Sequence, residues 1–149
     1  MGLKRPETQI NMHQVNCDNA TIGTRLVFNP HKRYNQTKIH RLLFNLTLDK
    51  GANVLVYGTG TISGCRMKSG VLTVSGGGIV HRLVVEGGKV IVTNRGIIED
   101  IELRNGTSLE VYAGGKVKRI RQFGNVALNF HEGCKYSLKA KNDPIELPF

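Results

Sequence analysis

The sequence predicts an all-β fold, a single-stranded β-solenoid (β-helix) of about five coils of 18–19 residues with N- and C-terminal caps. Three observations predict this fold. A glycine recurs at intervals of 18, 18 and 19 residues, and apolar residues follow it at the same positions each time. Ten residues after each glycine comes a second residue of a type that tolerates positive φ. A pair of apolar residues in strand spacing then precedes the next glycine.

Residues at equal positions of successive coils are expected to stack into columns. The recurring glycines are Gly60, Gly78, Gly96 and Gly115, and the second bends fall at Gly70, Gly88, Gly106 and Asn125. The inward columns, two, five and seven positions after the glycine, are Ile62, Val80, Ile98 and Val117; Cys65, Leu83, Ile101 and Ile120; and Met67, Val85, Leu103 and the polar Gln122. The strand pairs before each glycine run from Val54 and Val56 to Leu128 and Phe130. Because one coil cannot bury its apolar face alone, its neighbours must stack on it about 4.8 Å away.

The pattern divides the chain into three regions. Residues 1–25 are expected to form an N-terminal cap, residues 26–134 the solenoid, and residues 135–149 a C-terminal cap or tail. Residues 31–41 follow the turn signal Asn29-Pro30 and interrupt the first coil. We therefore expect residues 31–41 to form an exposed loop.

The stretch from Asn53 to Cys65, NVLVYGTGTISGC, has a glycine pattern close to that of a dinucleotide-binding loop. Such a loop needs its third glycine to open a helix whose N-terminus faces the phosphates. The residues that follow, ISGCRMKSGVLTVSGGG, have neither helical periodicity nor helix-forming composition. The glycines therefore indicate turns, and no cofactor is expected.

Residues for catalysis or metal binding are sparse. His13 with Cys17, and His131 with Cys134, have the short spacing of zinc ligands, but they belong to opposite ends of the predicted stack. No nucleophile elbow or cysteine-nucleophile signature is present, and Cys65 falls in an inward column. The sequence therefore predicts no metal, no catalytic residues and no enzyme activity.

The segment from Gly58 to Gly133 contains SGVLTVSGGG, VVEGGKVIV, RNGTSLEVYAGG and KVKRIRQFGNVAL. These motifs resemble the short glycine-rich repeats of AIDA-type autotransporter adhesin passengers, over about half of the chain. The resemblance implies a β-solenoid. Such adhesins are long and are exported through an outer-membrane barrel, whereas MGLKRPETQINMHQ has no apolar segment typical of a signal peptide. We therefore expect the fold without the adhesin function, in a cytoplasmic protein with no membrane contact.

Charged residues in the repeats are expected to form ladders between coils. One outward column alternates in sign, and a second places basic residues over acidic ones. The columns are Asp49, Lys68, Glu86 and Arg104; Arg82, Asp100 and Arg119; Lys118 over Glu99; and Arg121 over Glu102. The alternative is that Lys116, Lys118, Arg119 and Arg121 form a patch that faces a ligand.

The charge that the ladders leave unbalanced lies mostly in the loop HKRYNQTKIHR, residues 31–41. The chain has 21 Lys and Arg against 11 Asp and Glu, a formal net charge of +10, which favours nucleic acid, anionic surfaces or acidic proteins as partners. Basic side chains beside a tyrosine suit phosphate contacts with stacking on a base. The candidate binding residues are Lys32, Arg33, Tyr34, Lys38, His40 and Arg41, with Lys4, Arg5, Lys135, Lys139 and Lys141 as additions. The alternative is a loop that only keeps the protein soluble.

The sequence thus predicts a non-enzymatic basic β-solenoid that contacts nucleic acid or a nucleic-acid-handling protein complex, such as a phage-type or mobile-element inhibitor or accessory factor. An alternative from another class is a self-assembling structural or adhesin-like surface module. Solenoids have open strand edges at both ends, which associate into homo-oligomers unless they are capped.

Overall fold

The computed structural model describes residues 7–9, 20–23, 25–28, 42–58, 60–140 and 143–149. Every regular element in these ranges is a β-strand, and none of them contains a helix that could cross a membrane. The strands are β1 (Glu7–Gln9), β2 (Thr21–Ile22), β3 (Arg25–Phe28), β4 (Leu42–Leu48), β5 (Asn53–Val56), β6 (Thr61–Met67), β7 (Val71–Val74), β8 (Ile79–Val85), β9 (Lys89–Val92), β10 (Ile97–Leu103), β11 (Ser108–Val111), β12 (Lys116–Gln122), β13 (Ala127–Phe130) and β14 (Lys135–Leu138).

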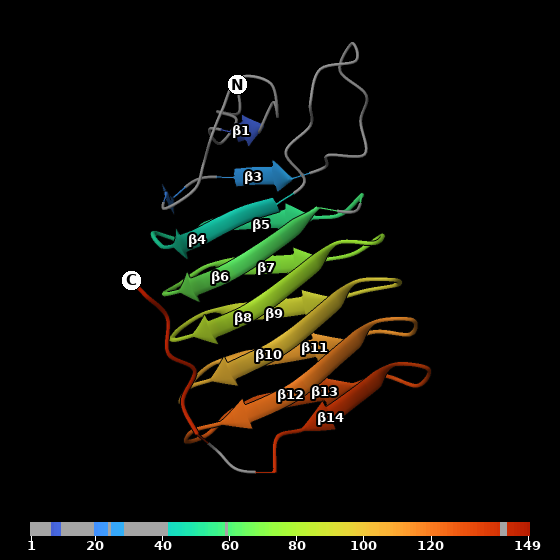
Figure 1. Ribbon diagram of the computed structural model, residues 1–149. Helices are drawn as coiled ribbons and strands as arrows, with labels where there is room; N and C mark the ends of the chain where they lie inside the picture. Colours follow the sequence, from blue (N-terminus) through green and yellow to red (C-terminus); the bar gives the residue numbers. More distant parts are fainter. Residues whose placement is uncertain (1–6, 10–19, 24, 29–41, 59, 141–142) are drawn as a thin grey trace, which may run out of the picture.

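These strands form two parallel sheets, and together they make a β-solenoid of about five coils (Figure 1). The first sheet has the order β1-β3-β5-β7-β9-β11-β13 and the second the order β14-β12-β10-β8-β6-β4-β2. From β5 to β12, each coil contributes a four-residue strand to the first sheet and a seven-residue strand to the second. The predicted fold class is therefore confirmed.

The register of the second sheet matches the predicted columns. Ile62 is aligned with Val80, Val80 with Ile98, and Ile98 with Val117. These side chains, like those of the column from Cys65 to Ile120 and the column from Val54 to Leu109, are almost fully buried. Burial of each aliphatic side chain contributes about 1.5–3 kcal/mol, so the stacked columns form the core that holds the coils together.

The seven-residue strands are bent at their fourth residue, which has a left-handed backbone conformation in each of β4, β6, β8, β10 and β12. These residues stack in one column: Asn45 (φ 56°), Gly64 (82°), Arg82 (59°), Asp100 (65°) and Arg119 (56°). The bend interrupts the alternation of side chains, which explains why two inward columns are separated by three residues instead of two. Arginine has no intrinsic preference for this conformation, which costs about 1–2 kcal/mol per residue.

Close approach of the preceding coil requires glycine in both recurring sets, as at Gly88 and Gly96, and the second set also uses positive φ. Gly96 does not have positive φ, but a Cβ atom there would lie 2.1 Å from the carbonyl oxygen of Val74 in the preceding coil. The second bend does use positive φ, with 95° at Gly70 and 98° at Gly88. In the last such bend this conformation belongs to Gly124 (81°) and not to Asn125, because a glycine is available one position earlier.

The chain after β14 returns along the side of the solenoid. β14 adds half a coil, and its four residues are all exposed. The C-terminal segment, residues 143–149, then runs back towards β6 along the second sheet, as the trace that ends at the label C in Figure 1 shows.

Candidate functional site

The predicted binding residues Lys32, Arg33, Tyr34, Lys38, His40 and Arg41 lie outside the described residues. The described residues on either side are Phe28, at the end of β3, and Leu42, at the start of β4. By their register, these two strand ends lie on the edge of the solenoid formed by the turns 57–60, 75–78, 93–96, 112–115 and 131–134. We call this edge of the solenoid the first turn edge.

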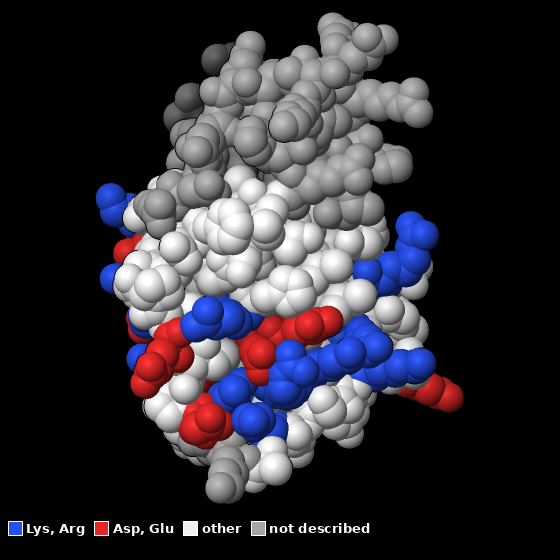
Figure 2. Space-filling view, viewed as in Figure 1, with Lys and Arg blue, Asp and Glu red and all other residues white. Residues whose placement is uncertain are grey.

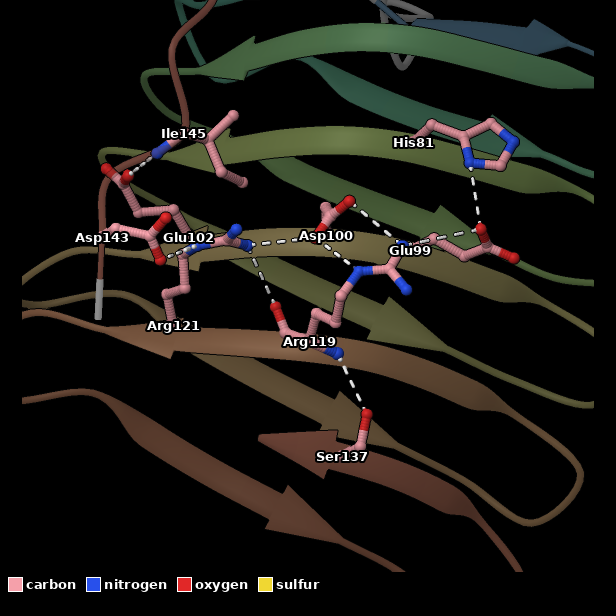
Figure 3. A network of polar contacts seen from close by, with 9 residues as sticks. All are labelled: His81, Glu99, Asp100, Glu102, Arg119, Arg121, Ser137, Asp143 and Ile145. Carbon is pink, nitrogen blue, oxygen red and sulfur yellow. Dashed lines mark hydrogen bonds and ion pairs between the residues drawn. The ribbon is translucent and has the colours of Figure 1, made fainter. Parts of the chain in front are cut away.

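Acidic side chains of β10 hold arginines of β12 in the second sheet (Figure 3). Arg119 donates two hydrogen bonds to Asp100, from Nε to Oδ1 at 2.7 Å and from Nη2 to Oδ2 at 3.1 Å. Arg121 donates a third from Nη1 to Asp100 Oδ1, at 3.2 Å. The hydrogen bond from Arg119 is the main cause that lowers the pKa of Asp100, so this carboxylate stays ionised at neutral pH.

A second group of ion pairs joins three successive coils. Glu86 contacts Arg66 at 2.6 Å and Arg104 at 3.2 Å. Arg104 also donates from Nε to Glu102, a carboxylate that is only 1% exposed and accepts a further hydrogen bond from the backbone N–H of Ile145. We call the two groups together the charge ladder, made of Glu86, Glu99, Asp100, Glu102, Arg66, Arg104, Arg119 and Arg121.

The predicted alignments of Lys118 with Glu99 and of Arg121 with Glu102 are confirmed, but several contacts differ from the predicted columns. Arg121 is aligned with Glu102 yet reaches diagonally to Asp100. Glu86 pairs with Arg66 and Arg104 and not with Lys68. Glu99 is aligned with Lys118 but lies near His81 Nδ1, at 3.4 Å, and Arg119 Nη2, at 3.8 Å. The long side chain of arginine explains the contacts of Arg121 and Arg119, whereas His81 is itself aligned with Glu99 in the preceding coil.

Four cations at or near the first turn edge have no ion pair with any described residue. Lys116 is the first residue of β12 and is aligned with Lys135, the first residue of β14, so two like charges lie directly opposite each other. Lys118 is two residues further along β12. Arg95 is exposed in the turn before β10, where its backbone is hydrogen-bonded to Gly77 and Gly114, residues without side chains. We call Arg95, Lys116, Lys118 and Lys135 the cationic group.

The cationic group surrounds a hollow in the surface. Arg95, Lys116 and Lys135 line a cavity of about 420 Å³ together with Ile97, Gly114, Gly115 and Gly133. The glycines are required by the stacking of the coils, since a Cβ atom at Gly114 would lie 2.2 Å from Asn94 Oδ1. In Figure 2, blue side chains predominate over this edge of the lower coils, with a red one at its outer end, whereas red and blue side chains alternate across the middle of the same face. Like charges opposite each other destabilise a sheet, and a bound anion removes this cost.

A second cavity, of about 430 Å³, lies beneath the C-terminal segment. Arg82, Asp100 and Arg121 line it from the sheet, and residues 143–146 line it from the segment. Arg82 donates to the backbone oxygen of Glu146, and Arg66 donates to that of Phe149 at 2.8 Å. Asp143 lies 3.6 Å from Arg121 Nε, a buried nitrogen with no hydrogen-bond partner among the described residues. Asp100 and Asp143 already face Arg121, and Arg82 already donates to a backbone oxygen, so this cavity is a weaker anion site than the first.

The described residues hold little that suits catalysis. Among them, no group of three or more His, Cys, Asp or Glu side chains is placed to bind a metal ion. Burial raises the pKa of the Cys65 thiol to about 12, so the thiol is inert. Glu110 contacts His131 Nε2 at 2.9 Å and Lys89 Nζ at 3.0 Å, and these hydrogen bonds lower its pKa to about 2. Glu110 is therefore a permanent anion and not a proton carrier at neutral pH.

Comparison with protein-family models, with curated proteins and with solved structures gives no match. The structure has the stacked coils that the resemblance to AIDA-type passenger repeats implied, but no family relationship to those adhesins is shown. The function is therefore argued from the surface of the molecule alone.

The sequence pointed to part of the cationic group. Lys116 and Lys118 belong to the alternative patch that the sequence left open, but Arg119 and Arg121 of that patch are paired with Asp100. Arg95 was missed. The available signal was its position in a turn whose neighbours in the adjacent coils, Gly77 and Gly114, have no side chain to neutralise it.

Proposed function

We propose that the protein is a non-enzymatic binding protein that holds nucleic acid along its first turn edge. The observation that carries the proposal is a contrast between two sets of cations: the arginines of the charge ladder form ion pairs with carboxylates, whereas the cationic group forms none with a described residue, although Lys118 is aligned with Glu99. Cations left unpaired on one edge neutralise the phosphates of a polyanion and release its counterions.

The spacing of the cations supports a linear ligand. Lys116 and Lys135 occupy equal positions of successive coils, about 4.8 Å apart along the stack. Arg95 lies in the turn one coil before the turn that precedes Lys116. A polyanion lying along the stack would meet one or more cations in each of these coils. A small single anion would need only one of them.

The basic sequence 31–41 extends this argument. It contributes four Lys and Arg and one tyrosine, and the described strand ends beside it, Phe28 and Leu42, lie on the same edge as the cationic group. A nucleic-acid-handling protein with an acidic surface presents the same type of charge, but it lacks the regular spacing of phosphates.

Binding of fluorescently labelled oligonucleotides, measured by anisotropy at low salt, tests the proposal. The informative variant is Lys116→Glu with Lys135→Glu. The matched control is Lys50→Glu with Lys68→Glu, which changes the charge equally on the opposite turn edge, where both lysines are exposed. We expect the first pair to weaken binding of an oligonucleotide of about 20 residues by at least about tenfold and the control to change it much less.

Two outcomes would contradict the proposal. Equal weakening by both variants would mean that only net charge matters. Absence of binding by the unmodified protein at low salt, for both single-stranded and duplex oligonucleotides, would exclude nucleic acid as the ligand.

A further inference from the structure

The C-terminal end of the solenoid is an incomplete coil. β13 is paired only with β11, and β14 only with β12, so each has one edge without a strand partner among the described residues. Figure 1 shows the two strands at the end of the stack, with the C-terminal segment, residues 143–149, rising along the side. Free backbone N–H and C=O groups along such edges pair readily with other strands.

The same end exposes apolar side chains that are buried in every earlier coil. Leu128 and Phe130 are only partly buried, whereas Leu109 and Val111, which precede them in their columns, are 0–1% exposed. Tyr136 and Leu138 of β14 are 52% and 59% exposed. The rings of Phe130 and Tyr136 stack with centroids 3.8 Å apart, so the end carries an aromatic surface that spans the two sheets.

The end also has a hollow beside its apolar surface. β14 stops at Leu138, opposite Ile120, while β12 continues to Gln122. A cavity of about 530 Å³ lies there, lined by Ile120, Gln122, Gly124 and Leu138–Ala140. A side chain from a molecule stacked on the end would fit into this hollow.

We propose that this end binds the same end of a second copy of the chain, in a two-fold symmetric dimer. The two free edges belong to opposite sheets, and their strands run in opposite directions, as the arrows of β13 and β14 in Figure 1 show. A single strand from another protein would pair with only one of the two free edges. A second copy turned by 180° brings two antiparallel edges with the same separation, so both edges are paired and both apolar surfaces are covered.

Two-fold symmetry limits the assembly to two copies of the chain. An isologous contact uses the same surface on both copies and leaves no further C-terminal end exposed, whereas head-to-tail stacking produces open filaments. The charged residues of the described end are Glu132, Lys135 and Lys139, which carry both signs of charge. The dimer contact and the proposed nucleic-acid surface meet at Lys135, the first residue of β14, whereas the variants that test the dimer change Tyr136 and Leu138.

Sedimentation equilibrium of the full chain over a range of concentrations tests the dimer. The unmodified protein should sediment as a monomer–dimer equilibrium, and Tyr136→Glu or Leu138→Glu should shift the dissociation constant by at least about tenfold. Both side chains are more than half exposed in the single chain, so their replacement removes little of the core. Leu42→Glu is the control, since Leu42 is an exposed apolar residue far from this end and should leave the equilibrium unchanged.

Hydrogen exchange gives a second readout that needs no substitution. Amides of β13 and β14 should exchange more slowly at high than at low protein concentration, while those of β7 to β10 should not change. A monomer at all concentrations, filaments instead of a dimer, or a dimer that persists in both end variants would overturn the proposal.

Discussion

The arginines of the charge ladder and the lysines of the cationic group lie on the same sheet, but they have different surroundings. Arg119 makes two hydrogen bonds to Asp100, whereas Lys116, three residues earlier in β12, faces Lys135. Paired charges in neighbouring coils each contribute about 0.2–1 kcal/mol and penalise a slip in register. The lysines of the cationic group form no ion pairs with described residues and make no comparable contribution to the free energy of unfolding. The charge ladder therefore holds the coils in register, and the cationic group is available to a ligand.

The largest expected effect is that of disturbing the register itself. A Cβ atom at Gly88 (φ 98°) would lie 2.4 Å from the carbonyl oxygen of Gly70, whereas one at Gly106 (φ 86°) would meet nothing within 4 Å. Gly88→Ala should lower the free energy of unfolding by about 3 kcal/mol or more, and Gly106→Ala by only about 1–2 kcal/mol, the cost of the left-handed conformation. Urea denaturation measures both. Equal losses would show that the close stacking at Gly88 is not what requires glycine.

Removing the central carboxylate of the charge ladder should have the next largest effect. Asp100→Asn keeps a residue that tolerates positive φ but leaves Arg119 and Arg121 without their carboxylate. The side chain of Arg121 is only 9% exposed, so we expect a loss of about 1–3 kcal/mol in the free energy of unfolding. Glu99→Gln, whose contacts are 3.4 and 3.8 Å long, should cost less than about 0.5 kcal/mol. If the two substitutions cost the same, Asp100 has no special role.

The pH dependence of stability should depend in part on Glu110. His131 and Lys89 lower its pKa from the ordinary value of 4.5 to about 2 in the folded protein. Its stabilising contribution is therefore complete above about pH 4.5 and is lost as the pH falls towards 2. Thermal melting between pH 5 and pH 2 should show a shallower decline for Glu110→Gln than for the unmodified protein. Parallel curves would mean that Glu110 is not held ionised by these contacts.

The smallest expected effect on stability comes from the cationic group. Lys135→Glu replaces the like-charge pair with Lys116 by an opposite-charge pair, so the free energy of unfolding should stay the same or rise by up to about 0.5 kcal/mol. Thermal and urea denaturation measure the change. A decrease in the free energy of unfolding greater than about 1 kcal/mol would show that Lys135 stabilises the fold, which would contradict a role in ligand binding alone.

Much of the fold could be predicted because the spacing of the repeats indicates which residues of successive coils are aligned. Equal spacing of glycines and apolar residues identifies which residues stack, and the three-residue step from Ile62 to Cys65 already indicates the bend at Gly64. The contacts of the charge ladder were harder to predict, since alignment does not tell which neighbour a long arginine reaches. The C-terminal segment belongs to no repeat, so its course along the second sheet left no periodic signal.

The candidate site was predictable only in part. Net charge and the absence of acids indicated the sequence 31–41, which lies outside the described residues, whereas Lys116 and Lys118 entered only with Arg119 and Arg121, as the alternative to charge ladders between coils. Whether a cation is unpaired depends on the three-dimensional positions of acids in adjacent coils. Arg95 illustrates this dependence, since only the glycines beside it in the neighbouring turns leave it exposed.

The salt dependence of oligonucleotide binding tests the central claim most directly. The logarithm of the binding constant should fall linearly with the logarithm of the salt concentration, by about 0.7 per phosphate neutralised on a single strand. Lys116→Ala with Lys135→Ala should reduce the magnitude of this slope by about 1.4, while Lys50→Ala with Lys68→Ala should leave it unchanged. A slope that is the same for the unmodified protein and the Lys116/Lys135 variant would contradict the assignment of the cationic group as the binding surface.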